Sequence, residues 1–310
     1  MLIQKLRMGP IYLLDGETIR VLDDAYMLDL SYPAASPIIR RCQESLKAKD
    51  GTLKSLNTEI RIIPINSIGE IHPGTDLGLL IYEALCRQQQ TLSTGDILVV
   101  TQKIVSKAEG NVVDLDDVHA SEFARSLAAE SNKDAPYIEV VLRESRRIVR
   151  MDHGVLICET KHGFICANAG VDESNVNGAR TITLLPVDPD HSAQQLRTRL
   201  QDLSGEGSTF DIAVIISDTW GRPWRNGQVN MAIGVAGMEA IVDYRGQYDP
   251  YGYELHASML AVADELASAA ELVMGKIDHI PVALIRGYTY IPDEGSAKTL
   301  LRDPTTDMFR

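Results

Sequence analysis

Residues 213–225 read Ala-Val-Ile-Ile-Ser-Asp-Thr-Trp-Gly-Arg-Pro-Trp-Arg. The apolar residues that begin at Ala213 predict a strand, and this strand delivers Asp218 and Thr219 to its C-terminal end. A carboxylate and a hydroxyl are hard oxygen donors, which Mg²⁺ and Mn²⁺ prefer. The segment therefore predicts one half of a divalent-cation site at the edge of a sheet.

A second segment places the same kinds of side chain at the end of another predicted strand. Residues 168–175 read Asn-Ala-Gly-Val-Asp-Glu-Ser-Asn and present Asp172 and Asn175 beyond the sheet. Two aspartates on separate strand ends suit an ion that bridges protein carboxylates to the phosphates of a substrate. The alternative is that Asp172 caps a turn and Asp218 caps a helix. Spacing alone leaves both interpretations open.

Outward from these segments, short β-branched runs alternate with helical patterns, which predicts a mixed α/β fold. The expected strands cover residues 60–65, 96–100, 138–150, 154–159, 163–168, 181–186, 212–217 and 282–286. The expected helices cover residues 76–87, 121–130, 192–203 and 254–274. Residues 1–58 differ, because their short apolar pieces are broken by turn signals, and they read as an appended segment and linker.

The charge balance limits the partners. The chain has 30 Lys and Arg residues against 43 Asp and Glu, a net charge of −13. Such a chain repels nucleic acid, and a small anionic ligand would need a local cluster of cations or a bound metal. No apolar run of the ~18 residues that a membrane span needs occurs, and the N-terminus lacks the apolar stretch of a signal peptide. We therefore expect a cytoplasmic protein with no membrane partner.

The four cysteines, Cys42, Cys86, Cys158 and Cys166, are not spaced as in a secreted disulfide framework. Cys158, His162 and Cys166 could be read as zinc ligands, but this stretch has too few soft donors for a closed tetrahedral site. The interpretation that we favour is two apolar strands that contain cysteine.

The standard nucleotide motifs are incomplete. Gly275-Lys276 is followed by Ile277 where a P-loop has Ser or Thr, and no glycine stands five residues earlier. The glycines that begin at Gly205 do not complete a dinucleotide fingerprint, because Phe210 stands where the third glycine would be. Any nucleotide is therefore bound by other means.

Three cations near these segments are candidates for holding anionic groups. Arg222 and Arg225 flank a Pro-Trp pair, so two guanidinium groups and an indole could hold a phosphate and stack on a ring. The alternative is an ordinary loop with a tryptophan anchored in the core. Lys107 follows the strand expected at 96–100 and could reach a phosphate, or be an exposed loop lysine without a role.

Several longer blocks resemble one known family. They are Gly-Asp-Ile-Leu-Val-Val-Thr-Gln-Lys-Ile-Val-Ser-Lys-Ala-Glu-Gly at 95–110, the 168–175 segment, residues 217–237 with Asn-Gly-Gln at 226–228, Ala-Ala-Glu-Leu-Val-Met-Gly-Lys at 269–276, and residues 281–287. In this order they are similar to the coenzyme F420-0:L-glutamate ligase family. The resemblance runs from near residue 61 to the C-terminus.

The resemblance implies a fold and a set of ligands. The fold would be a mixed α/β, two-lobed ligase fold with mixed sheets, neither a P-loop nor a Rossmann fold. Residues 59–310 would form the ligase domain, with residues 1–58 as an N-terminal extension. The family also implies a homodimer, GTP as co-substrate, a divalent metal (Mg²⁺ or Mn²⁺) and K⁺. Because the chain ends soon after the last block, we expect it to lack the flavin-binding nitroreductase-like domain fused to some relatives.

The resemblance also assigns individual residues. The family's metal ligands fall on Asp172, Asp218 and Thr219. Its nucleotide contacts fall on Ile68, Gly69, Glu70, Ile71, Gln102, Lys103, Lys107, Asn175, Met274, Gly275 and Lys276. As catalytic candidates we take Lys107 for the phosphates, with Arg222 and Arg225 for the anionic deazaflavin or glutamate.

The expected reaction forms a carbon–nitrogen bond in coenzyme F420 biosynthesis. GTP would drive the addition of L-glutamate to the lactyl carboxylate of coenzyme F420-0 through an acyl phosphate, and further γ-linked glutamates could follow. One alternative is a metal-dependent phosphohydrolase, because the same aspartates and metal could activate water. Another is a non-catalytic protein that binds the deazaflavin or a nucleotide. Phosphate release without glutamate addition would identify the phosphohydrolase.

Overall fold

The computed structural model describes residues 59–173, 180–205 and 210–308, and three short strands before them. The chain divides into two compact units, Met1–Asn57 and Thr58–Arg310. In the first unit, three strands form an antiparallel sheet: β1 (Ile11–Leu14), β2 (Thr18–Val21) and β3 (Met27–Asp29). Of the candidate site residues, Asn175 lies outside the described residues.

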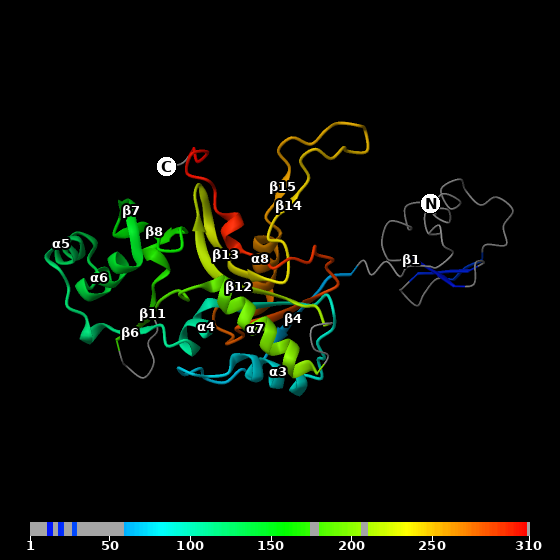
Figure 1. Ribbon diagram of the computed structural model, residues 1–310, viewed down its shortest axis with the longest axis horizontal. Helices are drawn as coiled ribbons and strands as arrows, with labels where there is room; N and C mark the ends of the chain where they lie inside the picture. The colour runs from blue at the N-terminus through cyan, green and yellow to red at the C-terminus, as the bar shows by residue number, and fades with distance from the viewer. Residues whose placement is uncertain are drawn as a thin grey trace. The chain divides into compact units, whose positions relative to one another are not determined.

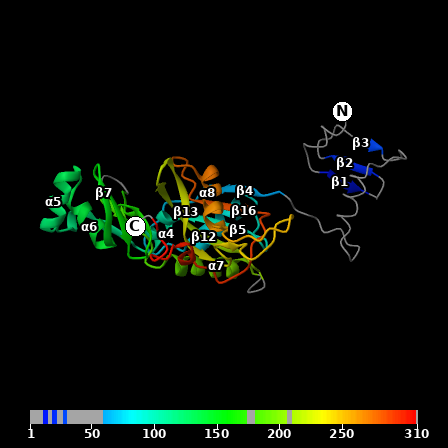
Figure 2. The same ribbon diagram turned by 90° about the horizontal axis from the view of Figure 1, so that it is seen from above.

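A five-stranded sheet forms the centre of the second unit (Figure 1, Figure 2). Its strands, in spatial order, are β13 (Arg225–Ala236), β12 (Ala213–Arg222), β5 (Ile97–Thr101), β16 (Val282–Arg286) and β4 (Arg61–Ile65). β12 and β5 are parallel, and the other neighbours in this sheet are antiparallel. The sheet is therefore mixed, and the predicted mixed α/β class is confirmed.

Helices cover both faces of this sheet. They are α3 (Leu77–Arg87), α4 (Gln102–Ala108) and α7 (Pro189–Ser204) on one face, and α8 (Val262–Met274) on the other. The cause is that residues 97–100 and 213–216 are fully buried and apolar, so alternate side chains need cover on opposite faces. Leu98 and Val214 belong to the core under α7, whereas Ile215 belongs to the core under α8. Figure 2 shows α8 and α7 on opposite sides of the strands.

A smaller lobe is built from the chain between α4 and α7, coloured teal to green in Figure 1. Its elements are β6 (Val112–Asp114), η1 (Leu115–Asp117), α5 (Glu122–Ser131), α6 (Ala135–Glu144), β7 (Ser145–Asp152), β8 (Val155–Thr160), β9 (Ile165–Ala167), η2 (Asn168–Gly170), β10 (Asp172–Glu173) and β11 (Thr181–Thr183). The strands form two antiparallel sheets, β7-β8-β9 and β10-β11-β6. The lobe has a core of its own, which includes Ile138, Val141 and Leu156.

A few elements lie outside these two layers. β14 (Val242–Asp243) pairs with β15 (Met259–Leu260), and the chain between them projects from the body in Figure 1. A 3-10 turn, η4 (Ala297–Leu300), comes after β16, the last strand of the central sheet along the chain. In the described part of the chain, no helix has the length and apolar character that crossing a membrane requires.

Three expectations about local structure were wrong. The strand expected at 138–150 is the helix α6 followed by the strand β7, because Asp134 and Pro136 start a helix that buries Tyr137 and Val141 on one side. The helix expected at 254–274 begins only at Val262. Lys107 lies on α4 and not in a loop. The other expected elements have counterparts that begin within a few residues of the predicted start.

Candidate active site

Asp218 lies within β12, just beyond the strand's buried run, so the interpretation of Asp218 as a helix cap is wrong. Its Oδ2 accepts a hydrogen bond from Trp220 Nε1 at 2.8 Å, and its Oδ1 accepts one from the Thr219 backbone N–H at 2.8 Å. Burial raises the pKa of Asp218 to about 6, and the nearby Asp172 carboxylate adds to the rise, against the opposite effect of Trp220 and Lys276. The carboxylate is therefore held in one orientation, beside a second negative charge.

Asp172 belongs to the smaller lobe, where it begins β10. It closely follows three residues in the left-handed region, Asn168 (φ 50°), Ala169 (φ 54°) and Gly170 (φ 70°). Such a conformation is strained for non-glycine residues and is concentrated at functional sites. Lys103 Nζ, from α4, lies 2.6 Å from Asp172 Oδ2. This ion pair joins the helix that follows β5 to the smaller lobe.

Thr219 takes part in a closed ring of polar contacts. Its Oγ1 donates to Asn230 Oδ1 at 2.6 Å, and Asn230 Nδ2 donates to Glu271 Oε2 at 2.6 Å. Lys276 Nζ lies 3.0 Å from Glu271 Oε1 and also donates to Thr219 Oγ1. Asn230 is 1% exposed, so its amide is fixed inside the protein. Thr219 Oγ1 donates one hydrogen bond to Asn230 and accepts one from Lys276. Its oxygen therefore keeps one lone pair for a further partner.

A cleft of about 570 Å³, which we call the lysine cleft, brings together most of the predicted nucleotide contacts. The predicted residues that line it are Ile68, Gly69, Glu70, Ile71, Lys103, Lys107, Gly275 and Lys276. Thr101, Ile104, His279, Ile280 and Pro281 also line it and were not predicted. Three ammonium groups therefore line one cavity in a chain of net charge −13, and they supply the local positive charge that an anionic ligand needs.

Two other predicted nucleotide contacts have side chains that do not line the lysine cleft. Gln102 is 2% exposed, and its Oε1 accepts a hydrogen bond from Ser106 Oγ at 3.0 Å. Met274 is 1% exposed and belongs to the core under α8. Both residues are next in sequence to a lysine or glycine that does line the cleft.

The two predicted arginines lie at the tip of the β12–β13 hairpin, and neither lines the lysine cleft. Arg222 Nη2 donates to the Asn226 carbonyl at 2.9 Å, while its Nε is buried without a hydrogen-bond partner among the described residues. Arg225 is exposed. Trp224, between them in the turn, is 82% exposed and so is not anchored in the core.

Cys158 and Cys166 lie directly opposite each other on β8 and β9. Both side chains are buried, and burial raises the pKa of each thiol. His162 is turned away from them, since its Nε2 lies 2.9 Å from the Pro186 carbonyl oxygen. The two cysteines are therefore packed as parts of apolar strands.

The oxygen atoms of Asp172, Asp218 and Thr219 suit a hard divalent cation. Among the described residues, no group of three or more His, Cys, Asp or Glu side chains lies close enough together to hold a metal ion. The carboxylates available at this site are therefore the pair Asp172 and Asp218. Mg²⁺ is commonly held by one or two carboxylates together with waters and substrate phosphates. Two ammonium groups already contact this set, Lys103 at Asp172 and Lys276 at Thr219. The donors present therefore fit a small cation that also binds phosphate.

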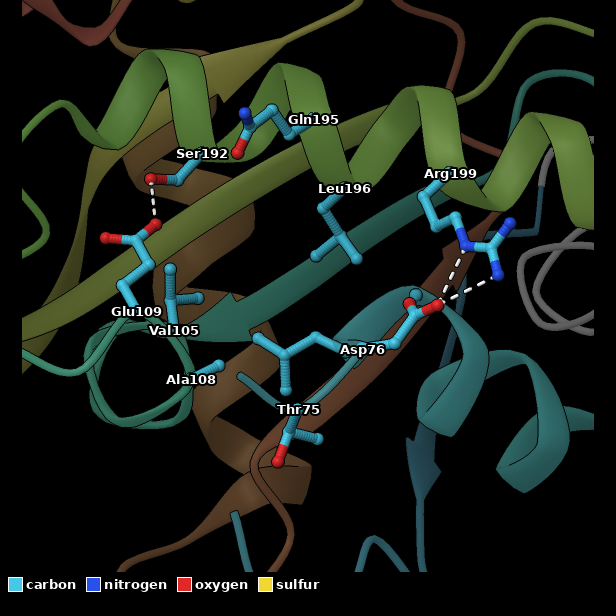
Figure 3. Close-up of a pocket in the computed structure, with 11 residues that line it drawn as sticks. Thr75, Asp76, Val105, Ala108, Glu109, Ser192, Gln195, Leu196 and Arg199 are labelled. Atoms are coloured by element: carbon cyan, nitrogen blue, oxygen red, sulfur yellow. Dashed lines mark hydrogen bonds and ion pairs between the residues drawn. The ribbon is translucent and has the colours of Figure 1, made fainter. Parts of the chain in front are cut away.

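A separate cleft of about 230 Å³ lies between α3, α4 and α7, and we call it the α3–α7 cleft (Figure 3). Asp76, the N-cap of α3, accepts hydrogen bonds from Arg199 Nε at 3.0 Å and Nη2 at 2.8 Å. Across the same cleft, Ser192 donates to Glu109. These groups satisfy one another and connect α7 to α3 and to the end of α4. None of the predicted site residues lines this cleft.

The fold and these contacts define a class of protein: mixed α/β proteins in which one carboxylate from the central sheet and one from a smaller lobe lie beside a lysine-lined cleft. Residues 66–287 match the F420-0:Gamma-glutamyl ligase family. The chain is 44% identical over 254 residues to the coenzyme F420:L-glutamate ligase of Methanothermobacter thermautotrophicus, a match that covers 81% of this chain and 99% of the relative.

Two further relatives with the same name agree. The Methanopyrus kandleri protein is 44% identical over 258 residues, covering 81% of this chain and 98% of its own length. The Archaeoglobus fulgidus protein is 38% identical over 252 residues, covering 81% and 96% respectively. The chain belongs to the F420-0:gamma-glutamyl ligase family.

Proposed function

We propose that this chain joins L-glutamate to coenzyme F420-0 with GTP as co-substrate, through an acyl phosphate on the lactyl carboxylate. As a member of its family, the chain is a ligase of coenzyme F420 biosynthesis that adds glutamate to coenzyme F420-0. One observation carries the finer part of the proposal. Lys103 both lines the lysine cleft and contacts Asp172, so the cleft and the carboxylate pair are parts of one site.

The phosphates of the nucleotide bind in the lysine cleft. There Lys103, Lys107 and Lys276 offset their charge, and the loop at residues 68–71 forms one wall. Phosphoryl transfer depends on positioning and charge neutralisation more than on covalent chemistry by the protein. A cleft with three ammonium groups and an adjoining cation site meets that need.

Asp172, Asp218 and Thr219 hold the divalent cation, Mg²⁺ or Mn²⁺. A cation held by these three residues would supply positive charge that offsets the charge of the phosphates. The chain keeps these oxygens in place: the Trp220 indole N–H donates a hydrogen bond to Asp218, and the Thr219 hydroxyl donates one to Asn230 Oδ1. These two contacts fix the position of the Asp218 carboxylate and of the Thr219 hydroxyl, whose oxygens keep lone pairs for the cation.

Lys103 and Lys276 serve two partners in turn. In the structure, their ammonium groups contact Asp172 and Thr219. With the cation held by these oxygens, both lysines would contact the phosphates in the cleft that they line. The carboxylates are then never left without a neighbouring positive charge, which would be costly at a partly buried site.

The bonds made and broken are as follows. An oxygen of the lactyl carboxylate attacks the γ-phosphorus of GTP, the bond from that phosphorus to the bridging oxygen breaks, and GDP leaves. The amine of glutamate then attacks the acyl carbon, the carbon–nitrogen bond forms, and inorganic phosphate leaves as the amine loses a proton to solvent. Activation is needed because a free carboxylate does not condense with an amine in water.

Three assignments stay predictions. Arg222 and Arg225, at the hairpin tip, are kept as candidate contacts for the anionic deazaflavin or for glutamate. A homodimer is tested by sedimentation of the purified chain. A requirement for K⁺ is tested by replacing it with Na⁺ in the assay.

The deciding experiment is mass spectrometry of coenzyme F420-0 after incubation with the chain, L-glutamate, GTP and Mn²⁺. A mass gain of one or more glutamyl units supports the proposal, and parallel reactions with ATP or with EDTA test the nucleotide and the metal. Phosphate release without a mass gain would replace the proposed ligase activity with that of a phosphohydrolase. If neither phosphate nor a glutamyl product forms, the alternative of a non-catalytic binding protein is favoured.

A further inference from the structure

The side chain of Glu271, on the last turn of α8, reaches the strand pair that carries the cation site. Its Oε2 accepts a hydrogen bond from Asn230 Nδ2 at 2.6 Å. Asn230 stands directly opposite Thr219 in the pairing of β13 with β12, and its Oδ1 accepts from Thr219 Oγ1 at 2.6 Å. The same helix also holds the backbone of Asn230, because Ser268 Oγ donates to its carbonyl at 2.8 Å. Glu271 is therefore connected to Thr219 through one asparagine.

The amide of Asn230 has an orientation that its partners dictate. Asn230 is 1% exposed, so its amide depends on protein partners rather than on bulk water. An ionised carboxylate such as that of Glu271 only accepts hydrogen bonds, so the group that faces it must be the NH₂ of Asn230. The amide oxygen then faces Thr219, and because this oxygen also only accepts, the Thr219 hydroxyl must donate. The Glu271 carboxylate therefore determines the direction of the Thr219 proton.

The opposite orientation of the Asn230 amide would close the Thr219 oxygen to a cation. The NH₂ of Asn230 would then donate to Thr219 Oγ1, which already accepts a hydrogen bond from Lys276. Both lone pairs of the hydroxyl oxygen would be used. The Asn230 oxygen would meanwhile face the Glu271 carboxylate, which is unfavourable because neither group has a proton to donate. Glu271 thus excludes the orientation in which Thr219 could not bind a cation.

The negative charge of Glu271 is a second way in which this residue could act on a cation. Lys276 Nζ lies 3.0 Å from Glu271 Oε1 and offsets that charge. The side chains of Lys276 and Glu271 are 57% and 23% exposed, so solvent screens the charge that remains. The hydrogen bond to the buried Asn230 is therefore the stronger connection between Glu271 and the cation site.

We propose that Glu271 is a positioning residue of the cation site: it orients the Asn230 amide so that Thr219 presents a lone pair, and not its proton, to the cation. The inference rests on the proposed function, which assigns Thr219 to the cation, and it adds a residue that acts through the ligand. Removal of a group that orients a metal ligand from behind typically weakens metal binding about 10- to 100-fold. The effect of Glu271 should lie in this range and should depend on the Thr219 hydroxyl.

The test compares Mn²⁺ affinity in the full chain and its variants, measured without nucleotide by electron paramagnetic resonance of free Mn²⁺. Glu271→Met removes the acceptor and should weaken Mn²⁺ binding about 10-fold. Glu271→Gln removes the charge but keeps an oxygen that can accept from Asn230, so it should retain most of the affinity. Equal weakening by both variants would mean that the charge is responsible, and the inference would be wrong.

A double-mutant cycle shows whether Glu271 acts through Thr219. Thr219→Val removes the hydroxyl and should itself weaken Mn²⁺ binding. In that background, Glu271→Met should cause no further loss, because the hydroxyl that Glu271 orients is absent. An equal loss with and without the hydroxyl would overturn the inference, and so would an unchanged affinity of the single variant Glu271→Met.

Asp264→Asn is the matched control. Asp264 also lies on α8 and accepts a hydrogen bond from β13, but its partner is the Ala232 backbone N–H, at 2.8 Å. Its Mn²⁺ affinity should equal that of the wild type, and thermal unfolding checks that every variant is folded. If the wild-type chain binds Mn²⁺ no more tightly than Asp218→Asn does, the cation site of the proposed function has failed, which is a result separate from the role of Glu271.

Discussion

The lysine cleft and the α3–α7 cleft share the helix α4, yet their charges are arranged in opposite ways. On one side of α4, Lys103 and Lys107 line the lysine cleft, and on the other Glu109 lines the α3–α7 cleft. In the α3–α7 cleft, Asp76 and Arg199 are both wall residues and neutralise each other. In the lysine cleft, the partners of the lysines stand outside the walls.

Those partners are the groups that the proposed reaction needs. Lys103 is held by Asp172, and Lys276 by Thr219 and Glu271, none of which lines the lysine cleft. An ion pair whose two side chains both line a cleft stabilises the fold. An ammonium group that lines a cleft, but whose partner lies outside the cleft wall, can change partners when a ligand binds. The position of each counter-ion therefore separates a structural cleft from a binding cleft better than size or polarity does.

The largest expected effect is that of Asp218→Asn, which removes one carboxylate behind the lysine cleft. Turnover should fall on the order of 1000-fold, because a lost donor weakens cation binding and charge neutralisation by several kcal/mol. Stability should stay within about 1 kcal/mol, since asparagine keeps the shape, and the loss of one accepted hydrogen bond is offset by removal of a charge that burial disfavours. The rate of glutamyl addition in metal-buffered solution and thermal unfolding measure the two effects.

Asp264→Asn provides the matched control for that change. Asp264 is also a buried aspartate that accepts a backbone hydrogen bond, from Ala232 at 2.8 Å, but it lies on α8 outside the site. Its variant should turn over like the wild type. Near wild-type turnover of Asp218→Asn would remove Asp218 from the cation site.

An intermediate effect is expected for Lys103→Met and Lys276→Met. Without nucleotide, both variants should bind Mn²⁺ a few-fold more tightly, because a competing ammonium worth about 0.2–1 kcal/mol is removed. Their affinity for GTP should fall about 10-fold, because a charged contact to phosphate is lost. Electron paramagnetic resonance of free Mn²⁺ and titration calorimetry report the two affinities.

Arg199→Met, in the α3–α7 cleft, should leave both affinities unchanged, because its partner Asp76 is part of the same cleft. Weaker Mn²⁺ binding by the lysine variants would contradict the exchange of partners.

The smallest effect is expected for Asp76→Ala, which breaks the closed pair of the α3–α7 cleft. Asp76 caps α3 by accepting from the Leu79 backbone N–H at 3.0 Å, so its loss should cost about 1 kcal/mol of stability without changing turnover. The side-chain hydrogen bond from Arg199 is the main cause that lowers the pKa of Asp76 below 3.8. Its contribution is therefore complete above pH 3.8 and is lost as the pH falls through the lower folded-state pKa.

Urea unfolding of Asp76→Ala and wild type, at neutral pH and in acid, measures this difference. The two proteins should differ at neutral pH and converge in acid. A difference that persists below the folded-state pKa would mean that the carboxylate charge is not responsible.

The sequence predicted the strand ends better than the contacts between them. Asp218 and Thr219 follow an apolar run that could hardly be anything other than a strand, and the resemblance added the residues of the lysine cleft. Asn230 and Glu271 were not predicted. Asn230 lies 11 positions from Thr219, and Glu271 lies 41 positions beyond Asn230, so that only the packing of α8 on β13 brings Asn230 and Glu271 together. A lone buried asparagine gives no signal in a single sequence.

The wrong strand prediction at residues 138–150 has a local cause. Residues 138–141 are Ile, Glu, Val and Val, and a short β-branched run of this kind fits a strand or one side of a helix equally well. The decision came from outside the run, where Asp134 and Pro136 start the helix. Similarly, Gly234 on β13 gave no strand signal, but a Cβ there would lie 2.3 Å from the Pro189 carbonyl oxygen, so the glycine lets α7 begin against the sheet.

The place of β16 in the central sheet governs when a newly made chain can become active. β16 (Val282–Arg286) comes last in the sequence among the strands of this sheet, yet it lies between β5 and β4. Until residue 286 has left the ribosome, β4 has no partner in the sheet and one edge of β5 is unpaired. An open edge of this kind invites pairing with other chains. Emergence of residues 282–286 therefore completes the sheet by joining β4 to β5, and until then the unpaired edge of β5 is the part of the sheet most open to pairing with other chains.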